Sequence, residues 1–154
     1  MSGFEQIIPH VNELIHLSTD AANAFGGAGL VARNPQAKTV FFEIARQRSH
    51  WSFELSDAME GMLGASQGGP AQPSGLDTGW VTMLSHDSDT ERLSALDRAL
   101  TCHRFVIDRC RSVLDLDPPS PIRLLLQIQI DKADQSRKAL MDLAGQPGGG
   151  GPKV

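Results

Sequence analysis

The chain has 154 residues, 40% of them apolar, which suffices for the core of one ordinary domain. It carries 14 lysines and arginines against 18 aspartates and glutamates. The resulting net charge of -4 lacks the broad positive field that nucleic-acid binding requires. No apolar run reaches the roughly 20 residues that span a bilayer, and no signal-peptide pattern is present. We therefore expect a cytoplasmic protein that binds neither nucleic acid nor membrane.

The first two long helices are predicted in the N-terminal 64 residues. Apolar side chains recur over residues 4–25 at the spacing of an amphipathic helix. The glycine pair at 26–27 is expected to end this helix. A second helix is predicted to begin with Asn34 as its cap and Pro35 in its first turn, and to run to about Gly64.

A short helix and a third long helix are predicted next. The stretch "ASQGGPAQPSG" is too rich in glycine and proline for regular structure. The stretch "LDTGWVTML" can form a short helix with Trp80 and Leu84 facing inward. Ser88 and Glu91 form the S-x-x-E pattern of a capping box. They predict the start of a helix that runs to about Leu114.

The fourth long helix completes the predicted fold. "DLDPPSP" ends the third helix, and Ser120 with Pro121 opens a fourth that runs to about Ala144. Residues 1–144 are thus expected to form an all-α four-helix bundle, and residues 145–154 a flexible Gly/Pro-rich tail. The connection of about 24 residues between helices two and three is long enough to run along the bundle. It would make those two helices parallel, which is the ferritin-like connectivity.

Several stretches resemble a bacterial ferritin-like family. They are "VNELIHLSTDAANAF", "NPQAKTVFFEIARQRSHWSFEL", "SGLDTGW" and "DLDPPSPIRLLLQIQ", and they fall within residues 10–140. The resemblance implies a four-helix bundle and no established activity. Its motifs are mostly packing positions.

A ferritin-like di-metal site needs inward-facing carboxylates and histidines, including Glu-x-x-His pairs. The sequence contains no Glu-x-x-His. At 100° per residue, the predicted core-facing stripes also contain no carboxylate. The stripes are Phe4, Ile7, Ile8, Val11, Leu14, Ile15, Ser18, Ala22 and Phe25; Phe41, Ile44, Arg48, Trp51, Leu55, Met59 and Met62; Leu93, Leu96, Leu100, His103, Ile107, Cys110 and Leu114; and Ile122, Leu125, Leu126, Gln129, Ala133, Ser136, Leu140 and Leu143. We therefore predict no metal and no cofactor.

Two weaker metal alternatives remain open. His50 and Glu54 are an i, i+4 pair, but they fall off the stripe and are expected on a solvated flank. His103 and Cys110 fall on the stripe, but two ligands from one helix are too few for a metal. Cys102 is predicted to face away from the core.

One polar residue per helix stands out in the predicted core: Ser18, Arg48, His103 and Gln129. They can be separately satisfied, with Arg48 reaching the bundle end or pairing with a carboxylate. Alternatively they form a connected network that fixes helix register or lines a small-ligand pocket. No residue is predicted to be catalytic.

Apolar residues off the core stripes suggest a partner. Phe42 and Phe53 on helix two, and Leu124 and Ile128 on helix four, would form an apolar patch that a second copy could cover. We therefore expect a structural or interaction protein, with stress physiology implied by the family resemblance alone. The alternative is a metal-binding or oxidoreductase-type bundle with a degenerate site near His103. A third possibility is that the tail presents "PKV" to a partner.

Overall fold

The computed structural model describes residues 3–63, 75–86 and 88–145. They form four long helices, α1 (Gly3–Val31), α2 (Pro35–Leu63), α4 (Asp89–Leu114) and α5 (Ser120–Ala144), and one short helix, α3 (Trp80–Met83). The all-α prediction is confirmed, since no strand occurs in these segments. The predicted tail lies outside the described residues apart from Gly145.

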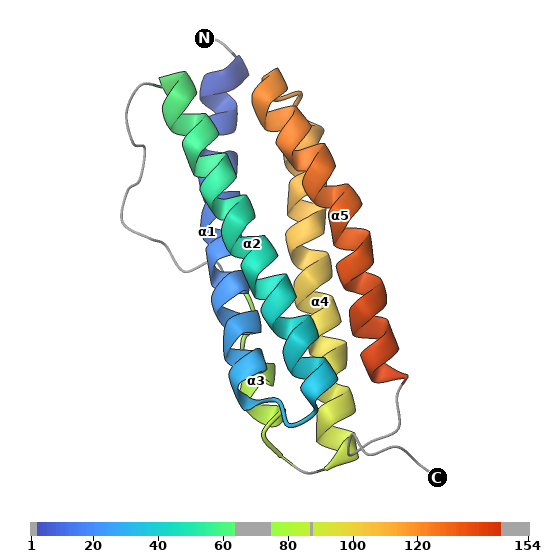
Figure 1. The fold of residues 1–154 in the computed structure, drawn as a ribbon. Coiled ribbons are helices and arrows are strands. Elements are labelled where there is room, and N and C mark those ends of the chain that lie inside the picture. Colours follow the sequence, from blue (N-terminus) through green and yellow to red (C-terminus); the bar gives the residue numbers. More distant parts are fainter. Residues whose placement is uncertain (1–2, 64–74, 87, 146–154) are drawn as a thin grey trace.

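The four long helices lie side by side (Figure 1). α1 runs down the view and α2 runs back up beside it, and α4 runs up and α5 down. α2 packs against α1 and α5, and α4 packs against α1 and α5, so α2 and α4 are diagonal neighbours that run in the same direction. α3 lies at the opposite end from the end of α2, against α1 and α4. None of the described helices is both long enough and apolar enough to cross a membrane.

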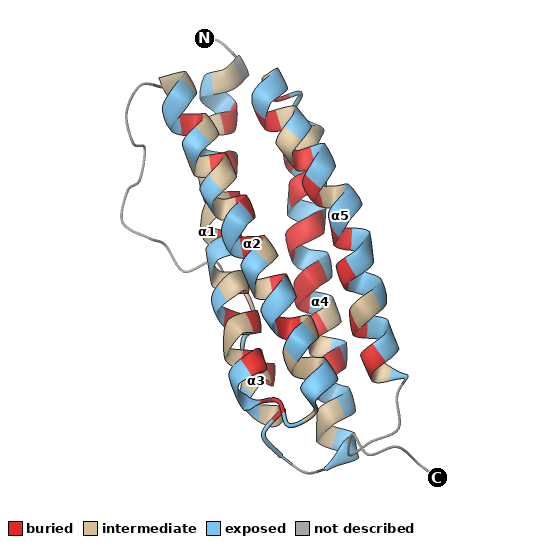
Figure 2. Ribbon diagram, in the orientation of Figure 1, coloured by how far each residue is buried: buried red, intermediate tan, exposed pale blue. Residues whose placement is uncertain are grey.

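Buried side chains line the inner faces of the long helices (Figure 2). The predicted stripes of α2 and α5 are buried, except for Met62 and Leu125, which are half-buried. The buried face of α4 is wider than the predicted stripe, of which Leu96, His103, Ile107 and Cys110 are buried. Cys102, expected to face outward, is buried with Val106 and Val113, whereas Leu93 is exposed. Besides four members of the predicted stripe, α4 buries a neighbouring row of residues, because it packs against α1, α3 and α5. This row consists of Ala95, Ala99, Cys102, Val106 and Val113.

The predicted helix starts are confirmed by their local hydrogen bonds. Asn34 Oδ1 accepts from the backbone N–H groups of Gln36 and Ala37 at 2.8 and 3.1 Å. Ser88 Oγ accepts from the N–H of Glu91 at 3.4 Å. These side chains satisfy amide groups that have no partner in the first helical turn.

The predicted end of the first helix at the glycine pair is wrong. α1 continues through Gly26, Gly27 and Gly29 to Val31. A Cβ atom at these glycines would lie 3.8 Å from Ala45, 3.4 Å from Val81 and 2.7 Å from the Phe42 ring, respectively. Gly29 therefore allows the Phe42 ring of α2 to approach α1 closely, whereas Cβ atoms at Gly26 and Gly27 would make ordinary contacts. Each glycine costs roughly 1 kcal/mol within a helix, and the close packing at Gly29 offsets that cost there.

Alanine substitutions at two helical glycines are expected to have opposite effects. Gly29→Ala should destabilise the protein by about 1–3 kcal/mol, because the new methyl group would overlap the Phe42 ring. Gly61→Ala should stabilise it by about 0.5–1 kcal/mol, because nothing lies within 4 Å of its Cβ position. Urea unfolding measures both changes. Equal effects of the two substitutions would contradict close packing at Gly29.

The segment around α3 closes one end of the structure. Trp80 is fully buried, and its ring centroid lies 5.3 Å from that of Phe25 and 6.1 Å from that of Phe41. Leu84 is also buried, as predicted. Arg98 of α4 donates two hydrogen bonds to Asp77, at 2.7 and 2.9 Å, and these bonds hold the pKa of that carboxyl below its usual value. The segment around α3 therefore contacts α1 and α2 through Trp80 and α4 through Asp77.

Candidate functional site

The four polar residues singled out in the sequence lie on four different helices. Ser18 (α1), Arg48 (α2), His103 (α4) and Gln129 (α5) are all buried, and Arg48 is 0% exposed. The structure joins two of them. Arg48 Nη2 donates to His103 Nδ1 at 2.6 Å. This bond crosses the core diagonally between α2 and α4, which do not pack directly against each other.

Arg48 has two further contacts that account for its place in the core. Its Nη1 donates to Gln47 Oε1 at 2.8 Å, and the same oxygen accepts from Ser136 Oγ of α5 at 2.9 Å. Its guanidinium lies 4.1 Å from the centroid of the Trp51 ring, a cation–π distance. The expected exit to the bundle end does not occur. Within the described chain the guanidinium has no carboxylate partner, so its charge is shared among neutral acceptors and a ring.

The charge on Arg48 persists at neutral pH. Burial lowers the pKa of Arg48 from its usual value to about 10, and the nearby Cys110 and Cys102 oppose this decrease. A buried cation without an anionic partner is costly, so the hydrogen bonds to Gln47 and His103 are needed to stabilise it.

His103 is held as a neutral ring. A guanidinium can only donate, so Nδ1 must accept from Arg48, and the ring proton must be on Nε2. The ring is also hydrogen-bonded to the backbone of Ala133, which we assign to Nε2–H donating to the carbonyl. Burial and the charges of Arg48, Arg137 and Arg104 lower the pKa of His103 from 6.5 to about 3.

Ser18 and Gln129 do not join this cluster. Ser18 Oγ and both amide atoms of Gln129 are buried and have no hydrogen-bond partner among the described residues, and the same holds for Arg48 Nε. Gln47 and Ser136 take part instead. Ser136 falls on the predicted stripe of α5, seven residues after Gln129, so periodicity could have identified it. Gln47 falls beside its stripe, and no sequence signal marks it.

Cys102 and Cys110 are free and buried. Burial raises the pKa of both thiols to about 12, although the charge of Arg48 opposes the increase. Both are therefore protonated at neutral pH. A protonated thiol is a poor nucleophile and a poor metal ligand.

The predicted metal alternatives do not form a cluster. His50 Nε2 lies 3.4 Å from Glu54 Oε1 on the surface of α2, as a simple i, i+4 pair. Across the described segments, no three histidine, cysteine, aspartate or glutamate side chains come together as a metal site would require.

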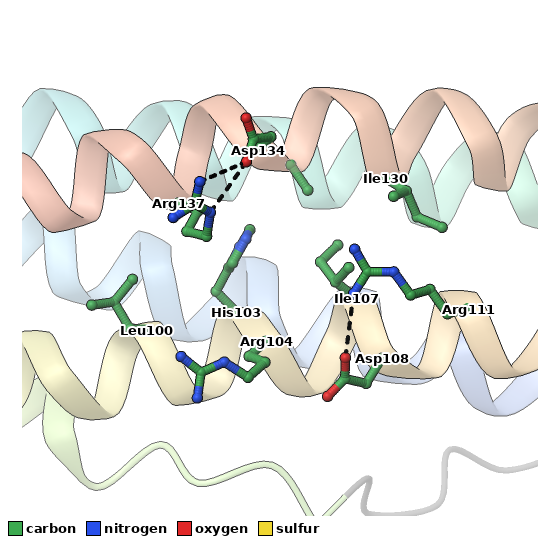
Figure 3. A pocket seen from close by; sticks show the side chains of 10 residues that line it. Leu100, His103, Arg104, Ile107, Asp108, Arg111, Ile130, Asp134 and Arg137 are labelled. Carbon is green, nitrogen blue, oxygen red and sulfur yellow. Dashed lines mark hydrogen bonds and ion pairs between the residues drawn. The ribbon is translucent and has the colours of Figure 1, made fainter.

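Two clefts flank α5 and reach the Arg48 cluster from opposite sides. The α4–α5 cleft, about 210 Å³ in volume, is lined by His103, Arg104, Arg137 and apolar neighbours (Figure 3). The α2–α5 cleft, about 500 Å³ in volume, is lined by Gln47, Trp51 and charged residues. Arg48 thus bonds to one residue at each cleft, His103 at the α4–α5 cleft and Gln47 at the α2–α5 cleft.

Acid is expected to destabilise the protein through His103. Unfolded His103 binds a proton near pH 6.5, whereas folded His103 binds one only near pH 3. Between these values the unfolded state binds more protons, so stability falls as the pH falls. From pH 6.5 to pH 4 the loss from this group is up to about 3 kcal/mol, at about 1.36 kcal/mol per pKa unit.

Urea unfolding of the parent and of His103→Gln between pH 7 and pH 4 measures this loss. Glutamine can accept from Arg48 but does not titrate, so the variant should show a shallower decline in stability. Parallel curves for the two proteins would contradict the assignment.

Comparison with family models, with curated proteins and with solved structures finds no significant match to this chain.

Proposed function

We propose that the protein is a non-catalytic four-helix bundle with ferritin-like connectivity and a structural or protein-interaction role in the cytoplasm. The parallel course of α2 and α4, with the long connection between them, supports this connectivity. A role in bacterial stress physiology rests on the family resemblance alone.

The observation that carries the non-catalytic assignment is the state of the polar core. Arg48 and His103 bond to each other, and His103 is also bonded to the backbone of Ala133. The two buried thiols remain protonated at neutral pH. Acid–base or metal chemistry requires groups with free lone pairs or suitable pKa values facing a substrate. Here the mutual bonds occupy those groups, which suits a core that fixes helix positions.

The surface supports the interaction role. Phe42, Phe53, Leu124 and Ile128 are between 44% and 67% exposed, on the adjacent helices α2 and α5. We propose that a second copy of the chain covers these side chains and forms a homodimer.

Sedimentation of Leu124→Glu tests the dimer. A buried, unpaired carboxylate at the interface should convert the dimer to monomer. Leu93→Glu is the matched control, because Leu93 is 43% exposed on α4, away from the proposed interface, and its replacement should leave the dimer intact. A monomeric parent protein would disprove the proposal.

The alternative function is a metal-binding or oxidoreductase-type bundle with a degenerate site near His103. It is favoured only by the position of His103 beside the α4–α5 cleft. Elemental analysis of the purified protein separates the two functions. Stoichiometric iron or manganese retained after mild chelation, and lost in His103→Ala, would establish the alternative.

A further inference from the structure

The α4–α5 cleft combines an apolar floor with a cationic rim. Leu100, Ile107 and Ile130 supply apolar surface, and the His103 ring points from α4 toward α5 between them (Figure 3). The cleft volume of about 210 Å³ is sufficient for a small molecule and too small for a peptide helix.

Three arginines and two aspartates line the same cleft. The aspartates are already engaged: Asp134 accepts from Arg137 at 2.8 and 3.1 Å and pairs with Lys138 at 3.2 Å. Asp108 lies 3.5 Å from Arg111. Arg104 forms no hydrogen bond or ion pair with the rest of the described chain. The cleft therefore has more cationic donors than its own carboxylates can occupy.

The positive charge extends behind the cleft. Arg48 touches the far side of the His103 ring, and no carboxylate within the described residues neutralises it. Arg137 and Arg104 both line the cleft together with His103. His103 is neutral, so it adds no charge of its own. An anion beside this ring would be attracted by Arg104, Arg137 and the buried Arg48 together.

We propose that the α4–α5 cleft binds a small organic anion, whose carboxylate or phosphate group is held by Arg104 and attracted by Arg137, which remains paired with Asp134, and whose apolar part rests on Ile107 and Ile130. Guanidinium groups bind both kinds of oxyanion in a bidentate manner. The apolar floor favours a ligand with a short hydrocarbon part over a bare inorganic ion. This site goes beyond the interaction role proposed above and does not depend on a dimer.

The test is an NMR titration of the full chain at constant ionic strength. Three probes are added separately: butyrate, propyl phosphate and, as a cationic control, butylammonium. Either anion should cause saturable shifts in the Nε–H signal of Arg104 and in the backbone amides of Leu100 and Ala133. Whichever anion binds more tightly identifies the headgroup, and butylammonium should cause no such shifts.

Two variants make the result specific. Arg104→Gln should weaken binding about tenfold, because it removes a charge-assisted contact from an exposed position that does not support the fold. Arg46→Gln, an exposed arginine in the other cleft, should bind as the parent does. Absence of saturable shifts with both anions, or equal weakening in the two variants, would overturn the proposal.

Discussion

Trp80→Ala is expected to lower the free energy of unfolding by about 3–5 kcal/mol, the range for loss of a large buried aromatic side chain. The indole is fully buried between Phe25 and Phe41. Its Nε1–H donates to the carbonyl of Asp77 at 3.0 Å. Removal of the ring would leave a cavity where α1, α2 and α3 meet, and it would release the segment that precedes α4.

Urea unfolding at neutral pH measures this loss, with Trp80→Phe as the matched control. Phenylalanine keeps an aromatic ring among its neighbours and removes only the hydrogen bond and part of the volume, so it should cost about 1–2 kcal/mol. A loss below 1 kcal/mol for Trp80→Ala would show that α3 is not docked in solution.

His103→Ala is expected to lower the free energy of unfolding by about 2–3 kcal/mol. The substitution creates a cavity. It also removes His103 Nδ1, to which Arg48 Nη2 donates, so that the buried guanidinium loses an acceptor. Arg48→Met should be milder, about 1 kcal/mol or less, because methionine preserves length and removes the desolvated charge. The apolar side chain would still pack on the Trp51 ring.

Thermal and urea unfolding of the two variants, with elemental analysis of the parent, distinguishes a structural role from a functional one. If His103 were a metal or catalytic residue, His103→Ala would retain parental stability and lose a bound species or an activity. We interpret burial of the arginine charge as the main destabilising factor in this pair. A larger loss of unfolding free energy in Arg48→Met than in His103→Ala would contradict this interpretation.

The sequence alone determined the elements that depend on near neighbours along the chain. The starts of α2 and α4 follow from Asn34 and Ser88, whose side chains bond amides two or three residues later. The core faces of α2 and α5 follow from apolar periodicity, which a straight helix preserves over its whole length. For the same reason the burial of Arg48 and Gln129 could be inferred before any contact was known.

Only the tertiary structure decided the features that depend on another helix. Gly26 and Gly27 favour the end of a helix by intrinsic preference, yet α1 continues, because Phe25 and Ala28 on either side of them are packed in the core. Cys102 is buried because α4 contacts three helices, α1, α3 and α5, and so buries a wider face than one stripe. The hydrogen-bond partners of the buried polar groups also could not be predicted from the spacing of residues within one helix. Arg48 meets His103 because their helices place both at the same level of the core, and a register shift of one turn, about 5.4 Å, would separate them.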